Sequence, residues 1–175
     1  MTDTPDDQPQ FDHVYEEQSN FVYNLARRLS KTQTDAEDLF QESFLKVLRF
    51  LPKFRGGSVR SWVRQIVVTT NISRYRGKKN QSQAALDEHE GWKESIPDES
   101  AGPETRAEQE EQKRELHEAL QRLNEGARQI LVLREIEGLS YDEIAELLDV
   151  PKGTVRSRLA RAREALRVVL EGSDG

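Results

Sequence analysis

Apolar side chains recur every three or four residues along most of the 175-residue chain, which is the period of an α-helix. The pattern predicts helices over about 11–30, 34–51, 58–75, 104–123 and 126–137, and two more between 138 and 170. We therefore expect an all-α fold. Because 35% of the residues are hydrophobic and 33% are charged, its cores must be small, with long polar edges.

Each predicted helix carries one apolar stripe, which we expect to face a core. In the N-terminal half the stripes comprise Phe11, Val14, Tyr15, Val22, Leu25, Ala26, Leu29, Leu39, Phe40, Phe44, Val47, Leu48, Leu51, Trp62, Val63, Ile66, Val67 and Thr70. In the C-terminal half they comprise Leu116, Ala119, Leu120, Leu123, Ile130, Leu131, Leu133, Ile136, Ile144, Ala145, Leu147, Leu148, Val155, Leu159, Ala162, Leu166, Val169 and Leu170.

Capping residues and helix breakers mark several of the expected helix ends. Thr34 with Glu37, and Ser140 with Glu143, have the spacing of capping boxes, in which each side chain serves a free amide of the first turn. The segment 52–57 (PKFRGG) interrupts the helical pattern, and we expect Ser58 to cap the helix that follows.

Segments without periodicity divide the chain. Residues 80–103 mix Gln, Ser, Gly, Pro and acids, and we expect them to form a flexible acidic linker. Residues 1–10 are expected to form a disordered tail, and residues 171–175 a short C-terminal tail. What remains is two small helical domains, 11–79 and 104–170.

Residue counts exclude several classes of function. The chain has no Cys and only three isolated His, so neither a metal site nor a His-based catalytic cluster is expected. No paired carboxylates in an apolar setting, nucleophile elbow or phosphate loop appears, so we expect neither a cofactor nor an enzyme. No apolar run approaches the roughly 20 residues that cross a bilayer, which indicates a cytoplasmic protein without membrane insertion.

The net charge of −6 conceals separate charged blocks. Residues 1–17 hold six acids and no Lys or Arg, residues 46–79 hold ten Lys or Arg and no acid, and residues 87–111 hold ten acids against two bases. The basic block includes Phe54, Trp62 and Tyr75, and aromatic faces among cations suit single-stranded or melting nucleic acid. Trp62 has a competing interpretation as a core residue among Val and Ile.

The segment 138–170 combines a short capped helix, a tight connection at 149–153 (DVPKG) and a basic amphipathic helix. Six Lys or Arg and one acid lie between Lys152 and Val168. This combination predicts a helix-turn-helix whose second helix enters a DNA groove. The alternative is an ordinary helical hairpin with a solvated Arg-rich face.

Two segments resemble a known family. Residues 35–56 (DAEDLFQESFLKVLRFLPKFRG) and 138–166 (GLSYDEIAELLDVPKGTVRSRLARAREAL) are similar to the two domains of bacterial sigma factors of the extracytoplasmic-function (ECF) group of the sigma-70 family. The second segment alone also resembles LuxR-type regulators, whereas both in this order are highly specific. The resemblance implies a region 2-like domain over 11–79 and a region 4-like domain over 104–170.

It further implies a subunit that binds core RNA polymerase and directs promoter recognition, −10 melting and transcription initiation. The residues matching the polymerase-binding pattern are Asp38, Gln41 and Glu42, for which stabilisation of the helix dipole is the competing interpretation. Those matching the part that captures and reads the −10 element are Lys53, Phe54, Arg55, Arg60, Trp62, Arg64, Asn71, Arg74 and Arg76. Those matching −35 recognition are Lys152, Thr154, Arg156, Ser157, Arg158, Ala160 and Arg161.

The chain departs from the family pattern in three places. The segment 56–62 is one residue shorter than usual, Ala160 stands where an aromatic residue can occur, and LNEGAR at 123–128 replaces the usual LPERER. The last change is expected to alter the start of a helix more than the function.

The resemblance also names partners. Core polymerase and promoter DNA are expected, and many family members are held inactive by an anti-sigma factor, which makes such a protein a candidate partner. The acids of the linker suggest mimicry of nucleic acid in a basic channel. Two other functions compete: a stand-alone helix-turn-helix regulator and a helical adaptor that binds protein.

Overall fold

The computed structural model describes residues 9–81 and 103–172, which form two compact units with one unit in each range. Both units are built from helices, and no strand occurs in these ranges, so the all-α prediction is confirmed. The predicted tails and linker lie mostly outside the described residues. No described helix has the length and apolar character needed to span a membrane.

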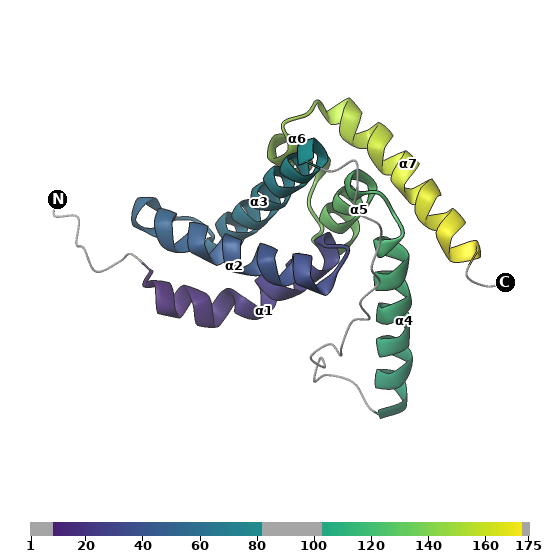
Figure 1. Cartoon of the computed structure of the whole chain (residues 1–175), viewed down its shortest axis with the longest axis horizontal. Coiled ribbons are helices and arrows are strands. Elements are labelled where there is room, and N and C mark those ends of the chain that lie inside the picture. The colour runs from purple at the N-terminus through teal and green to yellow at the C-terminus, as the bar shows by residue number, and fades with distance from the viewer. Residues whose placement is uncertain (1–8, 82–102, 173–175) are drawn as a thin grey trace. The chain divides into compact units, whose positions relative to one another are not determined.

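The first unit consists of three α-helices and one short 3-10 turn (Figure 1). In order these are α1 (Phe11–Leu29), α2 (Gln33–Phe50), η1 (Leu51–Lys53) and α3 (Val59–Gln81). Each α-helix packs against the other two. Their shared core contains the fully buried side chains of Val22, Leu25, Leu29, Leu39, Val47, Val63 and Val67. The predicted stripes supply this core because residues three and four apart lie on one helix face.

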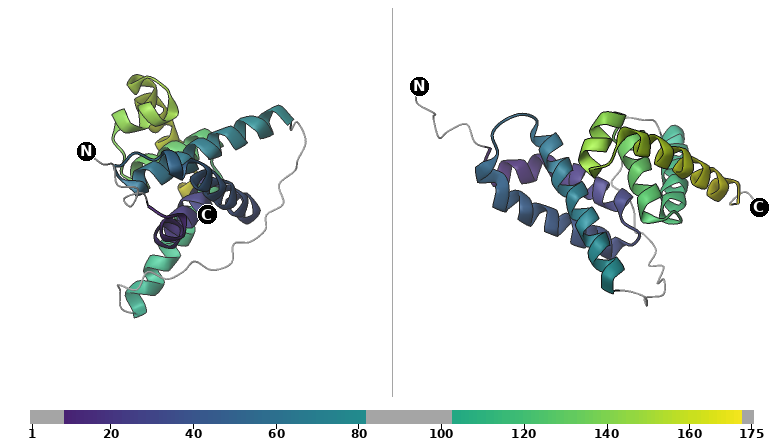
Figure 2. Two further views of the ribbon diagram at one scale, coloured as in Figure 1. Left: turned by 90° about the vertical axis from the view of Figure 1, so that its left-hand side faces the viewer. Right: turned by 90° about the horizontal axis from the view of Figure 1, so that it is seen from above.

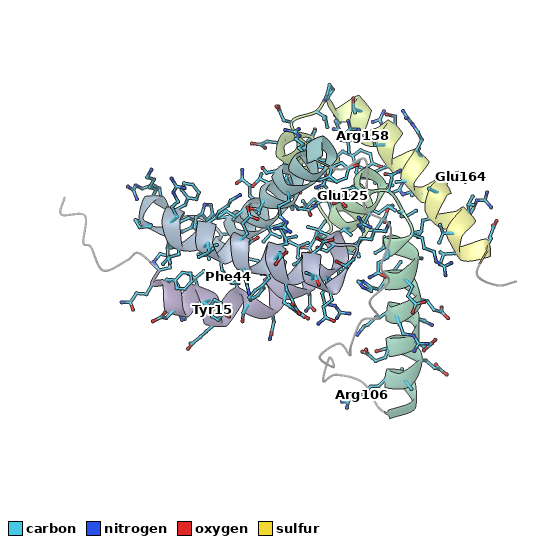
Figure 3. All side chains as sticks on the ribbon, in the orientation of Figure 1. Tyr15, Phe44, Arg106, Glu125, Arg158 and Glu164 are labelled. Atoms are coloured by element: carbon cyan, nitrogen blue, oxygen red, sulfur yellow. The ribbon has the colours of Figure 1, made fainter. Side chains whose placement is uncertain are left out.

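An aromatic cluster closes one edge of the first unit between α1 and α2. The rings of Tyr15 and Phe44 lie 4.7 Å apart, and those of Phe40 and Phe44 lie 5.0 Å apart. Figure 3 marks Tyr15 and Phe44 where the two helices meet. Tyr15 is an exposed residue, although its stripe predicted burial, because it lies at the margin of the helix pair.

Three other stripe residues are also exposed, contrary to the prediction. These are Leu48 in α2, Leu116 in the second unit, and Leu170 near the end of the chain. Each lies at the edge of its stripe or near a helix end, where no neighbouring helix covers it. A stripe wider than the contact it serves leaves its marginal residues in water.

Helix starts show one failure and two successes. The proposed Thr34–Glu37 box is wrong, because α2 begins at Gln33 and its cap is Thr32, whose hydroxyl oxygen accepts from the Asp35 amide at 3.1 Å. The Ser140–Glu143 capping box is confirmed, with bonds of 3.1 Å and 2.7 Å in the two directions. Ser58 also caps as predicted, since its hydroxyl oxygen accepts from the Ser61 amide at 3.2 Å.

The second unit contains four α-helices and one π-helical turn. In order these are α4 (Pro103–Gln121), α5 (Glu125–Leu131), η2 (Val132–Ile136), α6 (Tyr141–Leu148) and α7 (Lys152–Glu171). Helix α7 packs against α5 and α6, as the views in Figure 2 show. The core of the second unit includes Ile130, Leu131, Leu133, Ile144 and Leu159. The predicted single helix over 126–137 is therefore divided, with η2 widening its last turn.

The departure at 123–128 builds a well-satisfied start for α5. The Asn124 side-chain oxygen accepts from the Ala127 amide at 2.9 Å, so Asn caps the helix that Pro would otherwise begin. Arg128 is buried; its guanidinium pairs with Glu125 and lies 3.4 Å from the Leu123 carbonyl oxygen. The altered sequence preserves a helix start here.

Candidate functional site

The outward face of α2 carries the residues that the resemblance assigned to the polymerase. Asp38, Gln41 and Glu42 lie on one side of the helix because their spacing is three and four residues. Gln41 is exposed, and the side chains of Asp38 and Glu42 are 55% and 40% exposed. The same face continues to Leu45 and Leu48, which are also exposed. This surface is polar at its N-terminal end and apolar at its C-terminal end.

Arg74, expected to meet DNA, lies beside this acidic end instead. Its Nη1 donates to Glu42 Oε2 at 3.0 Å, and its Nη2 lies 3.6 Å from Asp38 Oδ2 and 3.9 Å from Asp35 Oδ1. The structure thus joins α3 to α2 through one cation and three carboxylates. Sequence reasoning could not find this contact, because Arg74 is 32 residues from Glu42 in the chain.

The loop after η1 presents an aromatic pair with basic neighbours. The rings of Phe54 and Trp62 lie 5.0 Å apart at 47°, and both residues are half-buried. Arg55 folds back so that its Nη1 donates to the Pro52 carbonyl at 2.9 Å, while Lys53 is exposed. Trp62 therefore has features of both a core residue and a nucleic-acid contact: it packs on Phe54, and part of its surface is exposed.

The remaining residues assigned to −10 recognition divide between two sides of α3. Arg60 lies over the Phe21 ring at 4.1 Å from the centroid, and Arg64 lies over it at 5.7 Å, so both face α1. Asn71 follows on that side and is only 7% exposed. Because each helical residue turns by about 100°, Trp62 and Arg76 lie on the opposite side. The nine residues do not form a single patch.

The helix-turn-helix has the geometry that its sequence predicted. Asp149 ends α6 with φ of 54°, in the left-handed region, and the Val150 amide donates to the Ala145 carbonyl at 3.0 Å. Helix α7 buries Val155, Leu159 and Ala162. The residues between and around these, Arg156, Ser157, Arg158, Ala160 and Arg161, are exposed. The first three turns of α7 therefore present a basic surface to solvent.

Carboxylates separate the cations of α7 into two groups. Arg156, Arg158 and Arg161 form no ion pair within the described residues. In contrast, Arg163 lies 2.6 Å from a Glu135 oxygen, and Arg167 lies 2.6 Å from Glu171. The count of six basic residues in the sequence hid this difference, which leaves Arg156, Arg158 and Arg161 available to an anion.

Two smaller contacts fix the start of α7. Lys152 Nζ lies 3.1 Å from an Asp142 carboxylate oxygen, which ties the helix to α6. The Ser157 hydroxyl donates to the Thr154 carbonyl at 3.1 Å, and Thr154 itself is half-buried. Free amides and the helix dipole at this terminus favour an anion.

Comparison with protein families matches both units. The sigma-70 region 2 family model matches residues 14–81, and the sigma-70 region 4 family model matches residues 113–166. Each lies within one unit, and they occur in the order that the two motifs predicted.

Curated proteins similar to the chain are RNA polymerase sigma factors. It is 36% identical over 159 residues to the ECF RNA polymerase sigma factor SigE of Mycolicibacterium smegmatis, covering 91% of this chain and 61% of that protein. It is 33% identical over 170 residues to the RNA polymerase sigma-H factor of Pseudomonas aeruginosa, covering 94% and 88%. Identity to the ECF RNA polymerase sigma-E factor of Escherichia coli is 36% over 137 residues, covering 75% and 72%.

Solved structures share the fold. The sigma factor RpoE in complex with the anti-sigma factor NepR from Bartonella quintana gives a TM-score of 0.66 at 24% identity, covering 92% of this chain and 96% of that one. CnrH in complex with the cytosolic domain of CnrY gives 0.58 at 23% identity, covering 93% and 88%.

Proposed function

The chain belongs to the ECF sigma factors of the sigma-70 family, and on that premise we propose how its two units divide the work of promoter recognition. It acts as a dissociable subunit that binds core RNA polymerase and directs promoter-specific transcription initiation. The polymerase performs the chemistry, so the subunit needs no catalytic residue of its own. Its place of action is the cytoplasm.

The second unit reads the −35 element with α7. The observation that carries this proposal is that Arg156, Arg158 and Arg161 are exposed and form no ion pair within the described part of the chain. Unneutralised arginines in the first turns of a recognition helix can bind phosphates or guanine edges in the major groove. Ser157 and Ala160 contribute surface between them, while Lys152 and Thr154 lie at the phosphate-facing helix start.

The first unit holds the melted −10 strand near the loop between α2 and α3. The Phe54–Trp62 pair offers a partly open aromatic face, and stacking of a displaced base is worth about 1–3 kcal/mol. Extruding a base costs a few kcal/mol, so phosphate contacts must supply the remainder. Lys53, Arg55 and Arg76 are exposed and suited to this task.

Arg60 and Arg64 extend the same basic region along another side of α3. Both guanidinium groups lie over the Phe21 ring, which fixes their direction. A guanidinium that stacks on an aromatic ring can donate from its edge to a phosphate, and on this ground together with the family resemblance we assign both residues to the DNA backbone. Asn71 is buried in the free protein and could act only indirectly.

The outward face of α2 binds the polymerase. Asp38, Gln41 and Glu42 present polar groups, and the neighbouring Leu45 and Leu48 add apolar surface. Protein interfaces combine apolar and polar surface, and this face offers both, at its two ends. The sigma factor RpoE, which is similar to this chain, was solved in complex with the anti-sigma factor NepR, so an anti-sigma factor is a candidate partner.

In vitro transcription tests the proposed function. The full chain is added to core polymerase with a library of genomic promoters, and run-off transcripts are sequenced. We expect transcripts from a defined set of promoters that require the chain. No chain-dependent transcript would overturn the proposal. Tight, specific binding to promoter duplex without polymerase would instead identify a stand-alone regulator.

A further inference from the structure

Arg74 connects the two surfaces that were proposed for polymerase and DNA. It belongs to α3, which carries the −10 residues, but its guanidinium lies among carboxylates of α2. The geometry points to Arg74 as a positioning residue that holds the acidic end of the polymerase-binding face, rather than as a contact with DNA. This inference rests on the proposed function.

The burial of each partner supports this role. The Arg74 side chain is 21% exposed, less than Asp38 or Glu42, so the cation lies behind its carboxylates. An ionised carboxylate has two oxygens and can accept from several donors. Glu42 illustrates this, since Oε2 accepts from Arg74 at 3.0 Å while Oε1 lies 3.6 Å from Lys46 Nζ. The outer sides of Asp38 and Glu42 remain open to a donor from the polymerase.

Charge explains why the acids need Arg74. Asp35, Asp38 and Glu42 follow one another along one side of α2, where like charges three or four residues apart repel. The rigid, planar guanidinium can satisfy more than one carboxylate at once, which an ammonium does less well. Holding the carboxylates in one arrangement before docking lowers the entropy lost when the partner binds.

The same charges argue against a phosphate on Arg74. A phosphate that approached its guanidinium would come close to three carboxylates, whose repulsion opposes binding. Arg76 lies two residues farther along α3, is exposed, and has no ion pair within the described ranges. It provides the contrasting arginine, because it can meet phosphate without that penalty.

Two measurements on the full chain separate the roles. The first is the Kd of the chain for core polymerase. The second is the base preference at the −10 element in transcription, measured at a chain concentration that saturates the polymerase. For Arg74→Ala we expect Kd to rise about fivefold, the loss typical of a partly exposed ion-pair network, with unchanged −10 preference at saturation. Arg74→Lys should recover part of the affinity. Arg76→Ala should show the reverse pattern, with promoter use falling more than polymerase binding.

A double-mutant cycle tests whether Arg74 acts through Glu42. If it does, Arg74→Ala should weaken polymerase binding much less in a Glu42→Gln background than in the wild type. A loss of fold would instead lower polymerase binding and promoter use together. Arg74→Lys keeps the positive charge and therefore serves as the control for that outcome. Unchanged Kd for Arg74→Ala, full additivity with Glu42→Gln, or altered −10 preference at saturation would each overturn the inference. If the wild-type chain fails to bind polymerase, the proposed function itself fails.

Discussion

Arg128 shows how much the second unit depends on one buried cation. Its side chain is 3% exposed, and it pairs with Glu125 and approaches the Leu120 and Leu123 carbonyls at the end of α4. Removing the cation would take a buried donor away from the Glu125 carboxylate and from the two carbonyl groups.

We therefore predict that Arg128→Ala destabilises the second unit by about 3–5 kcal/mol, the usual cost of breaking a buried ion pair. Urea unfolding followed by amide hydrogen exchange in α4 and α5 measures the loss. Arg122→Ala is the control, because Arg122 is an exposed arginine just after α4, and it should cost far less. Equal losses would show that burial of Arg128 is not the cause.

Glu164 gives a prediction about pH. Its hydrogen bond to Arg167 lowers the pKa of the Glu164 carboxyl, and the charge of Arg167 lowers it further. Since the folded pKa lies below the unfolded one, the stabilisation is complete above the unfolded pKa and is lost as pH falls through the folded pKa. A carboxyl titration by NMR should show this lowered pKa, and Arg167→Ala should return it towards the ordinary value. An unchanged pKa of Glu164 in the Arg167→Ala variant would contradict the pairing of these two residues.

Arg161 is the most informative single residue for −35 recognition. Arg161→Ala should weaken −35 recognition by about 1–3 kcal/mol if its contact is bidentate to a base. Arg167→Ala is the matched control, because it removes the same charge from the same helix but from an arginine paired with Glu164 and Glu171. Transcription is compared on promoters with intact and altered −35 sequences. An equal fall on both would show that Arg161 contacts phosphate alone.

At this scale the sequence predicts which residues are charged or apolar, and their spacing predicts most of the core. It does not predict partners brought together by packing. Arg74 meets Glu42 only after α3 has packed on α2. Likewise, Arg163 meets Glu135 from another helical element, so a count of cations overstated the free charge of α7.

At the scale of elements, the residue that caps α2 determines which acid falls in the first turn of the helix. Thr32 and Thr34 both have an acid three residues later, so the pattern alone does not distinguish them. In the structure only Thr32 has extended backbone and accepts the Asp35 amide, while Thr34 is already inside the helix.

This difference predicts a pair of stabilities. Thr32→Ala should lower the free energy of unfolding of the first unit by about 1 kcal/mol, because an amide of the first turn loses its acceptor. Thr34→Ala should change it by only a few tenths of a kcal/mol, since Ala is a good helix former. Thermal unfolding of the two variants measures both. A larger loss of stability for Thr34→Ala than for Thr32→Ala would support the Thr34–Glu37 capping box that the sequence suggested.

The existence of each helix was predictable, but its local geometry was less so. Apolar periodicity located all seven α-helices of the described ranges. It could not show that 126–137 changes from α to π at Val132, because that change depends on packing around the turn. Nor did it separate the two sides of α3, since basic residues occur on both.

At the scale of the molecule, the two units present different surfaces, which we propose to serve different parts of a promoter. The first unit has a partly open aromatic pair and an acidic face with exposed leucines. The second has a helix, α7, in which Arg156, Arg158 and Arg161 form no ion pair within the described ranges. The order of the two motifs predicts this division, which stays a prediction. The assignment of individual side chains required burial and ion pairs, which only the folded chain provides.

The most direct test of this division is transcription from a promoter library randomised separately at −10 and −35, using core polymerase and unit-specific variants. We expect Arg156→Ala with Arg161→Ala to alter −35 preference and leave −10 preference intact. Lys53→Ala with Trp62→Ala should change −10 preference alone. Variants of either unit that shift both preferences equally, or neither, would contradict the proposal that each unit reads its own promoter element.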